Sequence, residues 1–195
     1  IMATIKPGDK IKFHISAVNG EGYKNIQDDL GLHKIGADVE LTPQEGLIVK
    51  VHYNFEPEKY KSFDSSKNDY VYHDTVTLTV ISFFAGYKKE NKFRIGAEYN
   101  ILSNGKSYSN NADNYNLFGL SVFGAYIIND KLELFARFDM LTSGGKKISD
   151  PMNPAKQVTW NHNSNGYIII GGIQYNPVKG VRMSANYQGW TFENT

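Results

Sequence analysis

The sequence predicts an all-β protein, specifically an antiparallel up-and-down transmembrane β-barrel, and three observations support this. Apolar and polar residues alternate along most of the chain, as they do in strands with two unlike faces. The connections between these segments are alternately short and long along the chain. Aromatic residues gather toward the segment ends. A mean hydropathy of -0.44 and the lack of an apolar run near eighteen residues exclude a transmembrane helix but not membrane strands.

Alternation predicts ten strands and no helix. They cover residues 1–6, 10–19, 33–42, 46–56, 74–88, 92–102, 116–128, 131–142, 166–176 and 180–192. After the short first strand, the second, third and fourth each have one apolar parity and one polar parity, and the strands at 92–102 and 180–192 repeat that pattern. The segments at 74–88, 116–128 and 166–176 are apolar on both faces in places, so their register is less defined.

The eighth predicted strand, Lys131–Leu141, shows the alternation most clearly. Every residue of one parity is apolar, while the other parity carries Glu133, Arg137 and Asp139. Periodicity alone does not say which face points inward. A soluble barrel or sandwich buries its apolar face, whereas a membrane barrel turns it toward lipid and keeps the polar face for the lumen.

The connections favour the membrane arrangement. The short ones hold turn residues such as Pro7-Gly8-Asp9 and Asn129-Asp130, and they alternate with long polar loops at 20–32, 57–73, 103–115 and 143–165. Because antiparallel strands reverse direction each time, all short turns are expected at one end of the sheet and all long loops at the other. Outer-membrane barrels show this segregation.

Aromatic residues near strand ends are predicted to face outward, as interfacial residues of a membrane barrel do. The alternative is that they are ordinary core aromatics of a sandwich. The residues concerned are Tyr53, Phe55, Tyr99, Tyr126, Tyr167, Tyr175, Tyr187 and Trp190.

Charge and cysteine content narrow the function classes. The formal net charge of +1 gives no field that would attract nucleic acid, and the absence of cysteine removes disulfides, thiol nucleophiles and thiolate metal sites. The first residues show no basic segment followed by an apolar one, so no signal peptide is expected there. Ten strands would leave both ends on the long-loop side, so we expect residues 1–195 to form a single β-barrel domain that is incomplete at both ends and belongs to a larger barrel.

The inward parity supplies the candidate site, a set of pore-lining residues with six basic and six acidic side chains and two histidines. They are Lys12, His14, Lys34, Asp38, Glu40, Lys50, His52, Glu56, Arg94, Glu98, Glu133, Arg137, Asp139 and Arg182. Such charges can filter ions, or they can pair across neighbouring strands and merely satisfy one another. No motif predicts a catalytic residue, a metal site or a cofactor, so the chain is expected not to be an enzyme.

Several stretches resemble the phosphate-selective porin O and P family. The run Lys131–Thr142 resembles a characteristic strand of that family. Two further stretches resemble the same family, namely Ala17–Tyr23, where a strand meets a loop, and Gly171–Pro177 followed by Val181–Tyr187. The resemblance implies the later part of a Gram-negative outer-membrane barrel, usually trimeric, that passes small solutes. Members of that family select anions with basic residues, but six basic residues balanced by six acidic ones make no basic ladder, so phosphate selectivity is not carried over.

The leading hypothesis is therefore a porin of the bacterial outer membrane through which small hydrophilic solutes or ions diffuse passively. Its partners would be the lipid bilayer, those solutes and other copies in a homotrimer, with no nucleic acid. One alternative is a non-conducting outer-membrane barrel that acts in binding, adhesion or export. A second is a soluble ligand-binding β-barrel.

Overall fold

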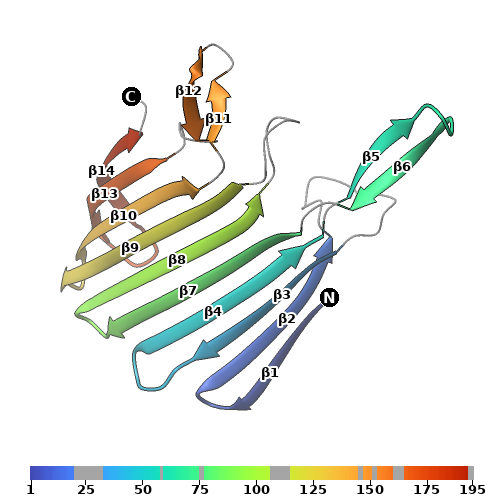
Figure 1. Cartoon of the computed structure of the whole chain (residues 1–195). Helices are drawn as coiled ribbons and strands as arrows, with labels where there is room; N and C mark the ends of the chain where they lie inside the picture. Colours follow the sequence, from blue (N-terminus) through green and yellow to red (C-terminus); the bar gives the residue numbers. More distant parts are fainter. Residues whose placement is uncertain are drawn as a thin grey trace.

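The chain forms one large antiparallel sheet with two small hairpins at one end of it (Figure 1). The computed structural model describes residues 1–19, 33–57, 59–74, 77–105, 115–144, 147–150, 153–159 and 165–192. None of these residues belongs to a helix long and apolar enough to cross a membrane.

Ten strands make up the large sheet, and each pairs with the strand that precedes it and the strand that follows it within the sheet. In order they are β1 (Met2–Gly8), β2 (Ile11–Asn19), β3 (His33–Leu41), β4 (Leu47–Glu56), β7 (Leu78–Lys89), β8 (Phe93–Gly105), β9 (Tyr115–Asn129), β10 (Leu132–Gly144), β13 (Gly166–Tyr175) and β14 (Met183–Phe192). All nine pairings are antiparallel, and β1 and β14 are the two outermost strands. The predicted all-β, up-and-down architecture of ten strands is confirmed.

Two of the predicted long loops contain hairpins that sequence alternation did not reveal. β5 (Lys59–Asp64) pairs with β6 (Asp69–Asp74), and β11 (Lys147–Asp150) pairs with β12 (Asn153–Thr159). The predicted strand at 74–88 therefore began too early, because Asp74 ends β6 and β7 starts at Leu78. Both hairpins lie at the end of the sheet opposite the short turns (Figure 1). The predicted segregation of short and long connections is thus visible in the structure.

Local hydrogen bonds explain the turn of the β5–β6 hairpin. The Ser66 hydroxyl and the Ser66 amide both donate to Asp64 Oδ1, at 2.6 and 3.0 Å, and the Lys67 amide donates to the Asp64 carbonyl. Asn68 follows with a positive φ of 48°. The Ser66 hydrogen bonds lower the pKa of the Asp64 carboxyl, because they stabilise its charged form.

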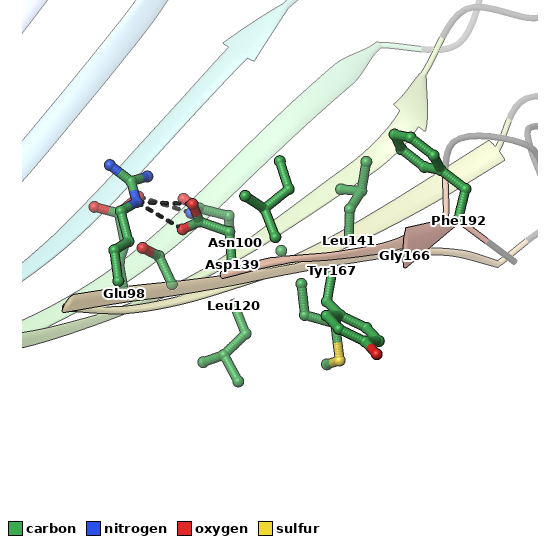
Figure 2. A pocket seen from close by; sticks show the side chains of 13 residues that line it. Glu98, Asn100, Leu120, Asp139, Leu141, Gly166, Tyr167 and Phe192 are labelled. Atoms are coloured by element: carbon green, nitrogen blue, oxygen red, sulfur yellow. Dashed lines mark hydrogen bonds and ion pairs between the residues drawn. The ribbon is translucent and has the colours of Figure 1, made fainter. Parts of the chain in front are cut away.

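The two faces of the sheet differ in chemistry and in exposure. Residues that pair directly across a ladder share a face, and one such row runs Lys12, Glu40, Lys50, Phe84, Glu98, Ser121 and Asp139. We call this side the polar face and the opposite side the apolar face. In Figure 2, Glu98, Asn100 and Asp139 lie on one side of the strands, and Leu120 and Tyr167 lie on the other.

Burial follows the polar face and not the apolar one. Glu40, Asn54 and Glu133 are 7–8% exposed, whereas Phe83, Ile95 and Ile169 on the apolar face are 46–53% exposed. Among the described residues Ala125 is the only buried hydrophobic residue. The apolar side chains therefore do not form a core within the described sheet.

A glycine fixes the turn between β3 and β4. Gly46 has a φ of +79°, and a Cβ built on it would lie 2.2 Å from the carbonyl oxygen of Lys88 on β7. The Gly46 carbonyl also accepts a hydrogen bond from the Lys88 amide at 2.8 Å. No other residue type fits this backbone without moving β7.

Gly46→Ala is therefore expected to lower the free energy of unfolding by about 1–2 kcal/mol, the usual cost of a strained backbone position. Urea unfolding of the protein in lipid vesicles measures it. Gly8→Ala is the matched control, because a Cβ at Gly8 meets nothing within 4 Å. Equal midpoints for the two variants would contradict this account of the turn.

Candidate functional site

The sheet register places almost all the sequence-predicted site residues on the polar face. Thirteen of the fourteen share it, namely Lys12, His14, Lys34, Asp38, Glu40, Lys50, His52, Glu56, Arg94, Glu98, Glu133, Arg137 and Asp139. Arg182 is the exception, because it lies just before β14 and is exposed. That these residues line a pore stays a prediction.

On β2, β3 and β4 a lysine pair encloses a buried carboxylate. Lys12 and Lys50 lie on either side of Glu40 in the register, and their ammonium groups approach its two carboxylate oxygens at 2.6 and 2.8 Å. Glu40 is 7% exposed, so the two cations compensate the cost of its burial. The group as a whole keeps one excess positive charge on the polar face.

The next row along the same strands holds His14, Asp38 and His52. His52 Nδ1 lies 2.5 Å from Asp38 Oδ1, and the Asn54 side-chain amide donates to His52 Nε2 at 2.8 Å. In this arrangement His52 Nε2 accepts from Asn54 and Nδ1 faces Asp38, while Asn54 Oδ1 is buried without a hydrogen-bond partner among the described residues. Thr4 Oγ1 lies 2.9 Å from His14 Nδ1. A histidine oriented by a carboxylate is an arrangement used for proton transfer, although Asn54 occupies the other ring nitrogen here.

Further along the sheet, an ion pair crosses over a whole strand. Arg94 on β8 binds Glu133 on β10 through both terminal nitrogens, one of them at 2.7 Å, although β9 lies between these strands. The residue beneath the pair is Ala125 of β9, directly opposite Arg94 in the register and 9% exposed. A small side chain at this position leaves the room that the pair needs.

The remaining charges on the polar face are paired more locally. Arg137 Nε donates to both oxygens of Asp139 on the same strand, at 2.9 and 2.7 Å. Lys34 and Glu56 are 3.7 Å apart. Glu98 accepts a hydrogen bond from Asn100 at 2.7 Å. Most charged side chains on the polar face of the described residues are thus paired with a neighbour, as the alternative to an ion filter predicts. Paired charges can also filter ions, so the pairing does not separate the two interpretations.

Aromatic rings on the polar face were not part of the predicted site. The rings of Phe84 and Phe123 are stacked with centroids 6.3 Å apart and planes 16° apart. Both lie against Gly96, where a Cβ would meet Phe123 at 2.8 Å and Phe84 at 3.2 Å, and Phe135 lies against Gly172 in the same way at 2.6 Å. Rings that cover strand glycines compensate for the missing side chains. The sequence alone shows only that each phenylalanine has the inward parity. Which glycine it covers depends on the register between strands, which the sequence does not give.

One aromatic prediction was wrong. Trp190 was expected on the apolar face with Tyr187, but it pairs with Ile168 on the polar face, because it is three residues from Tyr187 and parity alternates. Six of the other predicted outward aromatics are 40–74% exposed on the apolar face, namely Tyr53, Tyr99, Tyr126, Tyr167, Tyr175 and Tyr187.

Two cavities open where the aromatic rings meet the ion pairs. A cavity of about 320 Å³ is lined by Arg94, Phe123, Glu133, Phe135, Arg137 and Gln174, among others. A second one of about 360 Å³ includes Glu98, Asn100, Arg137, Asp139 and Phe192 (Figure 2). Its wall also holds Ser121, whose hydroxyl is buried without a hydrogen-bond partner among the described residues.

Comparison with known proteins places the fold. No family model matches the chain, and no curated protein matches its sequence. A solved structure described as outer-membrane expressed OmpT of Vibrio cholerae is similar, with a TM-score of 0.62 and 15% sequence identity over 98% of this chain and 54% of that one. The chain thus spans about half the length of the structure it matches. The fold is that of an outer-membrane β-barrel, and the resemblance to phosphate-selective porins is supported at this coarser level only.

The expectation that the chain is not an enzyme is corrected by the same match. That expectation rested only on the absence of sequence motifs. The similar structure is described as an outer-membrane expressed OmpT, and the likeness to it is one of fold. Barrels of one fold host both catalytic and conducting functions, so a likeness of fold gives no ground for excluding catalysis. The prediction that the chain has no enzymatic activity is therefore withdrawn.

Proposed function

We propose that this chain forms part of the wall of a bacterial outer-membrane porin, through which small hydrophilic solutes diffuse. The observation that carries the proposal is the contrast between the faces. Paired charges lie on the more buried polar face, while large apolar side chains such as Phe83 and Ile169 stay exposed on the other. Lipid covers an exposed apolar face, and water fills the space inside a ring of charges.

The same observation opposes a soluble ligand-binding barrel. Such a barrel packs its apolar face into a core, yet the described residues bury hardly any hydrophobic side chain. The bilayer around the apolar face, the solutes in the lumen and a homotrimer of the whole protein are the partners that we propose.

The direct experiment is conductance across a planar lipid bilayer with the detergent-solubilised protein. Stepwise current increases that scale with salt concentration support the porin. A protein that inserts into vesicles but opens no channel would refute it.

The second candidate is a non-conducting barrel that binds a partner through its long connections. The hairpins β5–β6 and β11–β12 favour it, because they extend the long-loop end of the sheet (Figure 1). The bilayer measurement separates the two candidates, since only the porin conducts.

Balanced charges on the polar face imply weak ion selectivity. We expect a reversal potential close to zero in a potassium chloride gradient, and a shift toward anion selectivity for Glu40→Gln, because that change leaves Lys12 and Lys50 without their carboxylate. Glu90→Gln is the control, since Glu90 lies in a turn beside Lys88 and is 79% exposed. An unchanged reversal potential for Glu40→Gln would place this group away from the ion path.

A further inference from the structure

We propose that the polar face carries a binding site for neutral sugars, formed by Phe123 and Phe135 together with the Arg94–Glu133 pair. The site is the cavity of about 320 Å³ described above. The entry of a sugar from the lumen rests on the proposed porin function, whereas binding itself does not. The volume of this cavity falls at the small end of the range for ligand cavities, which is about 300–1,000 Å³.

The aromatic rings supply the flat apolar part of the site. Phe123 is stacked on Phe84, and one side of its ring is held against Gly96, while the residue stays 38% exposed. Phe135 is held against Gly172 and lines the same cavity. Rings fixed in this way lose little freedom on binding. Their negatively polarised faces attract the C–H groups of a sugar ring.

The charged groups that line the cavity are Arg94, Glu133 and Arg137, and together with Asp139, which binds Arg137 from outside the lining, they are neutral as a set. This neutrality selects the class of ligand. Arg94 binds Glu133 through both terminal nitrogens, and Arg137 binds Asp139 through Nε, so a carboxylate compensates the charge of each cation. Guanidinium and carboxylate edges, with the Gln174 amide and the Ser184 hydroxyl nearby, offer both donors and acceptors. Sugar hydroxyls need both kinds of partner at once. A phosphate or an organic anion would instead need an uncompensated cation.

The test uses glucose and sorbitol, which have similar hydroxyl content but differ in having a ring. Saturation-transfer NMR on the detergent-solubilised full chain measures binding without requiring an open channel. We expect glucose to bind and sorbitol to bind at least severalfold more weakly. Equal binding of the two would overturn the proposal, as would stronger binding of benzoate, because that result would assign the site to aromatic anions.

Matched variants locate the site. Phe123→Leu and Phe135→Leu are each expected to lower glucose affinity about threefold to tenfold, the contribution of one aromatic contact. Phe138→Leu makes the same change on the apolar face of the same strand as Phe135, beside Tyr167, and is expected to leave affinity unchanged. Equal loss in all three variants would overturn the proposal, because it would reflect general destabilisation.

Bilayer current in the presence of maltose separates this inference from the proposed function. A channel that conducts and is blocked by maltose supports both. A conducting channel without sugar binding by NMR overturns the sugar site and leaves the porin standing. Sugar binding by a protein that does not conduct overturns the porin and leaves the sugar site standing.

Discussion

Replacing Ile169 with arginine is expected to lower the free energy of unfolding by about 2–4 kcal/mol, the cost of an arginine facing lipid near the middle of a membrane barrel. Ile169 is 49% exposed on the apolar face, and it pairs with Phe138, the middle residue of β10. A guanidinium there would face hydrocarbon with no partner within the sheet. Urea unfolding in lipid vesicles measures the loss.

The neighbouring residue provides the control. Ile168 has the same side chain one position earlier, but it lies on the polar face, directly opposite Asp139. Ile168→Arg places the new charge beside a carboxylate and toward water, so we expect a change of no more than about 1 kcal/mol. If Ile168→Arg were the more damaging variant, the assignment of the two faces would be reversed, and with it the proposed function.

This pair of isoleucines also shows what the sequence could predict. Period-two alternation is a local signal, and it located the ten strands of the large sheet to within a few residues. It fails where both parities are apolar, as in Ile168-Ile169-Ile170 of β13, because no contrast remains to mark the inward side. Only the pairing of β13 with the charged strand β10 resolves the faces.

The arrangement of the site depends on register, which the sequence does not state. His14 and His52 are far apart in the chain, yet both lie directly opposite Asp38 on β3. The aromatic rings behave similarly, since Phe135 covers Gly172 of a different strand. The two hairpins were missed for another reason. Their strands are only four to seven residues long, and the β5–β6 turn is stabilised by local contacts such as Ser66 to Asp64, which carry no alternation signal.

Replacing Arg94 with glutamine is expected to cost about 2–3 kcal/mol of unfolding free energy. The change leaves Glu133, which is 8% exposed, without the two hydrogen bonds that compensate its burial. This loss of stability is smaller than for a fully buried ion pair, because the Arg94 side chain is 53% exposed and water screens its charge. Glu133→Gln should cost less, about 1 kcal/mol, since Arg94 can turn toward water.

The double variant decides whether the two residues act as a pair. Once Glu133 is neutral, the loss of Arg94 leaves no buried charge, so Arg94→Gln combined with Glu133→Gln should be more stable than Arg94→Gln alone. Additive losses would mean that the pair does not form.

Ala125→Leu tests the same contact from below, because a larger side chain on β9 fills the space that Arg94 crosses to reach β10. A loss that disappears when Glu133 is already glutamine would assign the small residue at this position to the ion pair above it, and not to the packing of the sheet.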